Sequence, residues 1–328
     1  MDAPLTDGFG RAFHYLRLSV DEVCNYRCVY CLPEGYKPSA AAAEPPLNVA
    51  EIGRLVAAFA DMGFWKFRLT GGEPTTRADI VEIVERCARV PGARRLAMST
   101  NGYRLAPIAH ALAQAGLQAV NVSVDSLDPE RFARITGRND LAKVLAGVEA
   151  SLTEGLETKI NVVLLKGFNM ADYESFLRFS AERRVEVRFI ELMRTGDNEA
   201  FFNENHLSGE HILEMLKRGG WEEQARREGD GPARRFRRPG YAGSVGLIAP
   251  YSKDFCSTCN RLRVTSRGAL RLCLFAEGQA SLRELLASDG QREALKARVR
   301  SLLERKEVSH YLPDGRTGSA RNLALMGG

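Results

Sequence analysis

The sequence lacks the segments that would place a protein in or across a membrane. No run of about 20 nearly uncharged apolar residues is present, which excludes a transmembrane helix. Met1–Gly10 has no basic stretch followed by an apolar one, so we expect no secretory signal and a cytoplasmic location. Long low-complexity segments are also missing. With 45% hydrophobic and 27% charged residues, the composition excludes a mostly disordered or fibrous chain.

A large excess of charge of one sign is missing as well. The 46 Lys and Arg residues outnumber the 41 Asp and Glu residues by five. This excess does not by itself predict nucleic-acid binding, and it fits an anionic small ligand equally well. The basic run Arg226–Arg238 is typical of a solvated hairpin, although a zinc-dependent nucleic-acid-binding protein would use such a run. We expect no nucleic-acid partner.

Six of the seven cysteines form two groups that lie far apart in the chain. The groups are Cys24, Cys28 and Cys31, and Cys256, Cys259 and Cys273. A reducing compartment disfavours disulfides, and thiolates are ligands for zinc or iron–sulfur clusters, so two metal sites are predicted. A structural zinc site would need a fourth ligand from elsewhere, such as a distant histidine. A [4Fe–4S] cluster held by three thiolates would leave one iron open to a small molecule. Cys87 stands alone and is expected to be a buried helical residue.

Short β-rich runs alternate with helical patterns through the first 195 residues. The β-rich runs are Tyr15–Val20, Lys66–Thr70, Arg95–Ser99, Ala119–Asp125, Lys159–Leu165 and Glu186–Leu192. The helical patterns are Val49–Met62, Ala78–Ala88, Leu105–Ala115, Asp140–Thr153 and Ala171–Arg183. This alternation predicts parallel βα units with right-handed crossovers, and six units are two short of a closed barrel. We therefore expect an α/β fold, an open and partial (β/α)6 TIM-type barrel with its active face at the strand C-termini.

The alternation of β-rich runs and helical patterns ends after Leu192, which predicts a separate C-terminal module. The expected organisation is an N-terminal segment, 1–12, the partial barrel, 13–195, and a C-terminal module, 196–328, that covers the open side of the barrel. Within this module we expect helices at His211–Lys217 and Gln291–Glu304 and β-like pieces at Val245–Ala249, Arg261–Thr265 and Ala269–Leu274. These β-like pieces enclose the second cysteine group.

Polar residues interrupt the predicted strands, although barrel interiors are normally filled by branched apolar side chains. Cations occupy five separate strand positions, and hydroxyl and amide residues share the same strands. The cations are Arg17, Lys66, Arg68, Lys159 and Arg188. Because a buried unpaired cation is costly and Arg binds phosphate in a bidentate manner, the set predicts a pocket for a polyphosphate.

Two motifs resemble those of the radical S-adenosylmethionine (SAM) enzymes. The first is the CxxxCxxC string CNYRCVYC, with Tyr30 before its last cysteine, and the second is Gly71-Gly72-Glu73-Pro74 at the end of the second predicted strand. A third string, CSTCNRLR followed by Cys273, and the terminal pair Gly327-Gly328 are similar to the GTP 3′,8-cyclases. These are the radical SAM lyases that begin molybdenum cofactor biosynthesis.

The resemblance implies two [4Fe–4S] clusters, with SAM bound at the first and GTP meeting the second. It implies that Cys24, Cys28 and Cys31 hold the first cluster and that Cys256, Cys259 and Cys273 hold the second. Residues expected to contact SAM are Tyr30, Gly72, Ser123 and Met193. Residues expected to line the GTP site are Arg17, Arg68, Ser99, Lys159, Arg261, Leu262 and Arg263, with Lys66 and Arg188 as further phosphate candidates. Gly327 and Gly328 are expected to enter the active site and to be needed for catalysis.

The implied reaction converts GTP into (8S)-3′,8-cyclo-7,8-dihydroguanosine 5′-triphosphate, after a 5′-deoxyadenosyl radical takes hydrogen from C3′. Expected partners are an electron donor such as flavodoxin or ferredoxin and a downstream cyclic pyranopterin monophosphate synthase, and the protein is expected to be a monomer or homodimer. Two alternatives remain open at this point. One is another radical SAM enzyme with an auxiliary cluster, such as a peptide-modifying one, and the other is the zinc-dependent nucleic-acid-binding protein.

Overall fold

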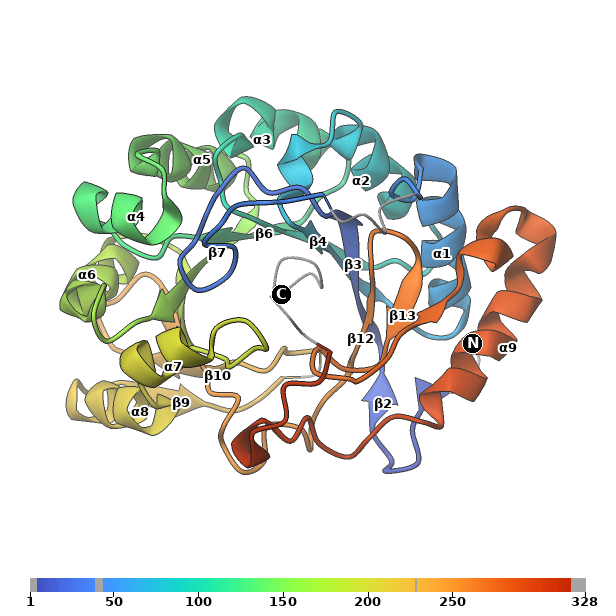
Figure 1. Cartoon of the computed structure of the whole chain (residues 1–328). Coiled ribbons are helices and arrows are strands. Elements are labelled where there is room, and N and C mark those ends of the chain that lie inside the picture. The colour runs from blue at the N-terminus through green and yellow to red at the C-terminus, as the bar shows by residue number, and fades with distance from the viewer. Residues whose placement is uncertain (1–4, 39–43, 228, 320–328) are drawn as a thin grey trace.

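The computed structural model describes residues 5–38, 44–227 and 229–319. Gly327 and Gly328 therefore lie outside the described residues. The chain forms an open α/β barrel, which confirms the predicted fold (Figure 1). Its six predicted parallel strands are β3 (Tyr15–Asp21), β4 (Lys66–Gly71), β5 (Arg95–Thr100), β6 (Ala119–Ser123), β7 (Glu157–Leu164) and β8 (Glu186–Glu191).

Helices cover the outer face of this sheet. They are α1 (Val49–Asp61), α2 (Ile80–Ala88), α3 (Leu105–Gln114), α4 (Pro129–Thr136), α5 (Leu141–Thr153) and α6 (Tyr173–Glu182). Helix α4 is not among the helical patterns predicted from the sequence, although Asp128 and Pro129 are typical helix-start residues. The Asp128 side chain accepts a hydrogen bond from the backbone N–H of Arg131 and so caps this short helix. Cys87 is completely buried in α2, as expected.

The C-terminal part adds strands to both edges of the same sheet. β12 (Arg261–Val264) pairs in parallel with β3, and β11 (Ser244–Ile248) pairs in parallel with β8. Antiparallel strands extend these edges, β13 (Ala269–Arg271) and β14 (Ala280–Ser281) beyond β12, and β10 (Arg234–Arg237) and β9 (Glu222–Gln224) beyond β11. The described chain thus has eight parallel strands in one open sheet, two of which come from the region expected to be a separate module.

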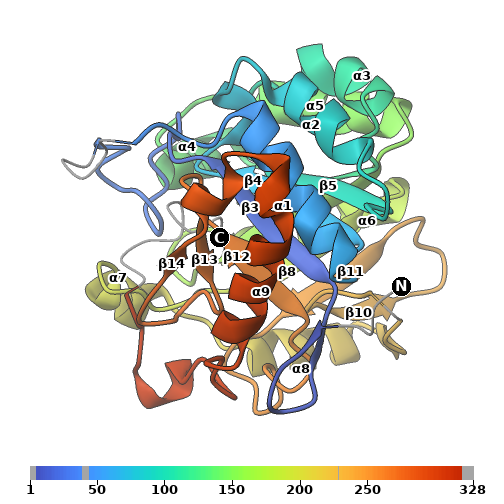
Figure 2. The same ribbon diagram turned by 90° about the vertical axis from the view of Figure 1, so that its right-hand side faces the viewer.

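The remaining elements lie around this open barrel. α7 (Glu199–Asn205) and α8 (Gly209–Arg218) follow β8, and α9 (Arg292–Leu303) packs against α1 (Figure 2). An N-terminal hairpin consists of β1 (Leu5–Thr6) and β2 (Ala12–Phe13). Over residues 5–38, 44–227 and 229–319, the helices are too short or too polar to cross a bilayer.

The two faces of each barrel strand have opposite character. In β3 and β4, the residues Leu16, Leu18, Phe67 and Leu69 are almost completely buried and belong to the main hydrophobic core. Because side chains alternate along a strand, the residues between them face the barrel interior. Those interior positions carry the cations and hydroxyls, so the core lies between the sheet and the helices and the interior is left for a ligand.

Candidate active site

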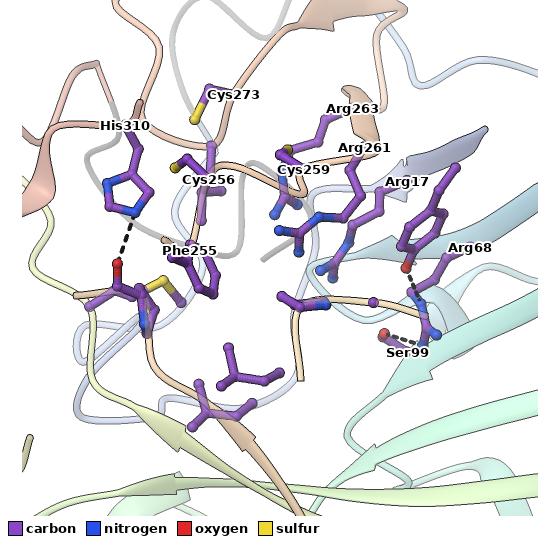
Figure 3. Close-up of a pocket in the computed structure, with 18 of the residues that line it drawn as sticks. Arg17, Arg68, Ser99, Phe255, Cys256, Cys259, Arg261, Arg263, Cys273 and His310 are labelled. Atoms are coloured by element: carbon purple, nitrogen blue, oxygen red, sulfur yellow. Dashed lines mark hydrogen bonds between the residues drawn. The ribbon is translucent and has the colours of Figure 1, made fainter. Parts of the chain in front are cut away.

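The interior faces of the strands form one pocket, and the residues predicted to bind phosphate line it (Figure 3). It is lined by Arg17, Lys66, Arg68, Ser99, Lys159, Arg188, Arg261 and Arg263. Leu262 differs from its neighbours, because its side chain is completely buried in the hydrophobic core. The structure therefore leaves only the backbone of Leu262 for any contact with a ligand in this pocket.

Arginines on adjacent strands point into the same space. Arg68 Nε donates a hydrogen bond to Tyr15 Oη at 2.6 Å, and Arg68 Nη1 donates to Ser99 Oγ at 3.3 Å (Figure 3). Burial and the neighbouring Arg261 lower the pKa of Arg263 to about 10. Burial and Arg263 likewise hold the pKa of Arg17 well below its usual range. Such mutual destabilisation of like charges favours an anionic ligand between them.

On the opposite side of the pocket, two of the cations have carboxylate partners within the protein. Lys159 Nζ lies 2.7 Å from Glu157 Oε1, and Arg188 Nε donates to Glu186 Oε1. Burial would raise the pKa of Glu186, but Arg188 and Lys159 lower it to about 2. Arg188 is therefore balanced by a buried carboxylate, which makes it a weaker phosphate candidate than Arg17 or Arg68.

The second cysteine group opens onto the same pocket. The pocket is lined by all three of its cysteines, Cys256, Cys259 and Cys273 (Figure 3). Burial raises the pKa of the Cys256 thiol, and the nearby thiols of Cys273 and Cys259 raise it further. Among the described residues, no group of three or more His, Cys, Asp or Glu side chains converges closely enough to hold a single metal ion. The sulfur ligands of a cluster bind different irons and need not converge on one point, so three thiols at the edge of one pocket fit such a group.

His310 also lines this pocket, although it was not among the residues predicted from the sequence. Its Nε2 lies 3.0 Å from the carbonyl oxygen of Pro250, and its Nδ1 accepts a hydrogen bond from the N–H of Leu312 at 3.0 Å. Because both ring nitrogens are engaged, His310 is not placed to act as a fourth metal ligand here. Nothing local in the sequence marks this residue, because its partners come from the folded chain.

The first cysteine group lies on the loop that follows β3. The backbone N–H of Cys31 donates to the carbonyl of Cys28 at 2.9 Å, which folds the CxxC part into a turn. Burial raises the pKa of the Cys28 thiol well above its ordinary value, and Asp125, Cys31 and Cys24 add to this effect. Three thiols on one short loop that influence one another in this way fit use as ligands of different irons in one cluster, to which they bind as thiolates.

Tyr30 is fixed from the end of β6. Its hydroxyl donates to Asp125 Oδ2 at 2.8 Å, and Asp125 Oδ1 accepts from the backbone N–H of Val163 at 2.9 Å. Ser123 ends β6 and stands in register with Asn161, which lines the pocket. Met193 lines the pocket itself and packs against the small hydrophobic cluster of Leu274, Phe275 and Leu312, which Cys273 also contacts. The predicted SAM residues thus lie near the C-terminal ends of the strands, as expected.

The Gly71-Gly72-Glu73 turn holds the end of β4 against the cysteine loop. A Cβ atom at Gly72 would lie 2.3 Å from the carbonyl oxygen of Val23, so only glycine allows the two backbones to approach this closely. Glu73 is buried and accepts hydrogen bonds from the backbone N–H groups of Thr75 and Asn101. The Thr75 and Thr100 hydroxyls also donate to its Oε1. The turn is therefore built to position the backbone beside the first cysteine group.

An open parallel barrel with a CxxxCxxC loop and a GGE turn at its strand C-termini defines the radical SAM class of enzymes. Residues 18–180 match the family model of the radical SAM superfamily, and residues 185–312 match that of Molybdenum Cofactor Synthesis C. Membership of this class implies SAM and a [4Fe–4S] cluster.

Curated relatives identify the family within this class. The chain is 51% identical to the GTP 3′,8-cyclase of Aeromonas hydrophila subsp. hydrophila, covering 99% of this chain and 96% of the relative. It is 48% identical to the GTP 3′,8-cyclase of Klebsiella pneumoniae subsp. pneumoniae over the full length of both. The chain belongs to the GTP 3′,8-cyclase family, which decides against both alternatives left open by the sequence.

Solved structures confirm the fold independently. SuiB of Streptococcus suis bound to S-adenosylmethionine matches with a TM-score of 0.58 and 14% identity, covering 87% of this chain and 68% of that one. Native anSMEcpe with bound AdoMet matches with a TM-score of 0.56 and 14% identity, covering 91% of this chain and 82% of that one. At these identities the likeness concerns the fold alone.

Proposed function

We propose that this protein converts GTP into (8S)-3′,8-cyclo-7,8-dihydroguanosine 5′-triphosphate, the first step of molybdenum cofactor biosynthesis. The observation that carries the proposal is one pocket lined by cations from β3, β4 and β12 and by the second cysteine group. A nucleoside triphosphate needs both a cationic site for its phosphates and a separate site for its base. Full-length identity near 50% to curated GTP 3′,8-cyclases supports the same assignment.

In this proposal Cys24, Cys28 and Cys31 hold a [4Fe–4S] cluster, and Tyr30, Gly72, Ser123 and Met193 contact SAM. When bound, this cluster and SAM supply the 5′-deoxyadenosyl radical that takes hydrogen from C3′ of GTP. The chain's own part is positioning: the GGE turn holds the backbone beside the cysteine loop, and Asp125 orients Tyr30. Holding the reacting carbons close together is an orientation effect, which lowers the activation barrier because the reacting groups are already placed.

The phosphates would bind to Arg17, Lys66, Arg68 and Arg263, which together form a cationic row across neighbouring strands. Arg17, Arg68 and Arg263 point into the pocket from neighbouring strands, with Lys66 beside them. These groups act on a part of the substrate that does not react, so their binding energy serves to place the ribose and base. Phe255 and His310 form part of the wall near the second cysteine group. Such apolar and aromatic surface would shield a radical from water.

We propose a division of labour between the two parts of the chain. Residues 13–195 would bind SAM, and residues 196–328 would supply Cys256, Cys259 and Cys273 as ligands of a second [4Fe–4S] cluster that meets the guanine. The tail residues Gly327 and Gly328 would enter the active site. The same proposal includes two partners, an electron donor such as flavodoxin or ferredoxin and a downstream cyclic pyranopterin monophosphate synthase. It also includes a monomeric or homodimeric state. A cytoplasmic setting belongs to it as well, because thiols that bind iron must stay reduced.

Anaerobic reconstitution tests the function directly. The protein is reconstituted with iron and sulfide and given SAM, dithionite and GTP, and the products are identified by mass spectrometry. We expect 5′-deoxyadenosine together with the 3′,8-cyclised nucleotide, and no cyclised product when GTP is replaced by ATP. Formation of 5′-deoxyadenosine without any cyclised guanine nucleotide would reject the proposed substrate while leaving the radical SAM assignment intact.

A further inference from the structure

Tyr15 occupies a position in the pocket that the proposed mechanism does not use. Three adjacent strands, β12, β3 and β4, each place two interior residues at matching register. One row consists of Arg261, Tyr15 and Lys66, and the next consists of Arg263, Arg17 and Arg68. All six line the pocket. Five of these positions are cations, and the sixth is a tyrosine.

The Tyr15 side chain is in direct contact with this cationic group. Tyr15 is only 4% exposed, and its hydroxyl accepts the 2.6 Å hydrogen bond from Arg68 Nε. The Lys66 ammonium lies 5.0 Å from the centre of the Tyr15 ring, within cation–π range. Lys66 Nζ also donates to the carbonyl of Gly229 at 2.6 Å, and the neighbouring residues Asp230, Gly231 and Pro232 line the pocket.

The charged groups that line the pocket together with Tyr15 are mostly positive. Titratable and charged groups facing the pocket are Arg17, Lys66, Arg68, Lys159, Arg188, Arg261 and Arg263, with Asp230, Cys256, Cys259, Cys273 and His310. Burial raises the pKa of Tyr15, but Arg68, Arg17 and Lys66 outweigh it and lower the pKa to about 7. A phenol held this way is partly ionised at neutral pH.

We propose that Tyr15 is a phosphate-responsive positioning residue, whose phenolate balances the cations of the empty pocket and which takes up one proton from solvent when a triphosphate enters. This inference rests on the proposed function, because it takes GTP as the ligand of the pocket. In the empty pocket the phenolate reduces repulsion among Arg17, Lys66 and Arg68. When phosphate oxygens arrive, they take over those cations, and the neutral hydroxyl can donate a hydrogen bond instead.

The sign of the pH dependence follows from this exchange. Above the pKa of Tyr15 the empty pocket holds a phenolate, which repels phosphates, so their binding is coupled to the uptake of one proton. Affinity for triphosphate therefore falls as the pH rises through neutrality. Lys66 and Lys159 contribute in the same direction, because burial lowers their pKa values to about 8 and about 7. The test thus needs a signal that belongs to tyrosine alone.

Tyrosinate absorbance in the near ultraviolet supplies that signal. Inorganic triphosphate, which does not absorb there, is titrated into the anaerobic reconstituted enzyme without SAM at about pH 8, where a phenol of this acidity is mostly ionised. Binding is followed in parallel by calorimetry. We expect the wild type to lose close to one tyrosinate per chain on binding. We expect Tyr15→Phe to show no loss and Tyr241→Phe to behave as the wild type. Tyr241 is a matched control, because it also lies beside an arginine, with Arg238 Nη1 at 3.5 Å from its hydroxyl.

The outcomes separate this inference from the proposed function. Triphosphate binding with unchanged tyrosinate absorbance, or an equal loss in Tyr15→Phe, would overturn the role of Tyr15. An intact cluster spectrum and SAM cleavage in Tyr15→Phe would show that the variant is folded. If the wild type cyclises GTP but shows no tyrosinate change, only the inference about Tyr15 fails. If it neither binds triphosphate nor cyclises GTP, the proposed function fails as well.

Discussion

Replacement of Gly72 by alanine tests how the GGE turn positions the first cysteine group. The added Cβ would lie 2.3 Å from the carbonyl oxygen of Val23 and 2.5 Å from that of Glu22. Both atoms belong to backbone that leads directly into Cys24, so no flexible side chain can move aside. Restoring ordinary contacts requires a shift of roughly 1 Å, and such overpacking typically costs about 1–3 kcal/mol.

A displacement of this size falls on the loop that is proposed to carry the cluster ligands. A misplacement of roughly 1 Å, even when it is caused by a substitution away from the reacting atoms, can lower rates by about 100-fold. We therefore expect Gly72→Ala to reduce 5′-deoxyadenosine formation by about this factor. Iron bound through Cys256, Cys259 and Cys273 should be retained, because that group lies on other loops.

The assay compares iron content, cluster absorbance and 5′-deoxyadenosine formation after anaerobic reconstitution. Gly278→Ala is the matched control, because no heavy atom lies within 4 Å of a Cβ built there. The control should keep wild-type values in all three measurements. Wild-type SAM cleavage in Gly72→Ala would refute the reasoning, since it would mean that the loop tolerates the displaced backbone.

The remaining predictions concern the pocket and its surroundings. Arg263→Ala should impair GTP turnover, measured as cyclised product, with no loss of iron, and unchanged kinetics would contradict the role of the cationic row. Cys259→Ala should keep some SAM cleavage but stop cyclisation, whereas Cys28→Ala should stop both; identical behaviour would contradict the proposed division of labour. Leu262→Ala should lower the free energy of unfolding by about 2–5 kcal/mol, because the Leu262 side chain packs in the core. GTP affinity should not change in Leu262→Ala, and a large loss would place that side chain in the pocket. Deletion of Gly327 and Gly328 should abolish turnover with both clusters intact, and full activity would exclude the tail from catalysis.

Local patterns were enough to predict the barrel strands and most of its helices. The six runs from Tyr15 to Leu192 became β3 to β8 with end shifts of one or two residues. Apolar alternation along a strand and cysteine spacing within a loop are properties of neighbouring residues, so sequence alone reveals them. The short helices α4 and α7 were missed, because seven or eight residues carry too little periodicity to stand out.

Pairing between distant segments was decided only by the tertiary structure. That β11 and β12 join the two edges of the barrel sheet depends on backbone hydrogen bonds to β8 and β3, and neither strand's own sequence specifies its partner. The same pairing turns Leu262 into the core while Arg261 and Arg263 face the pocket. It also brings Tyr15 between cations of two other strands. Residue types and spacings therefore determined which chemistry this chain can carry, whereas strand register, a non-local property, decided which of those residues meet.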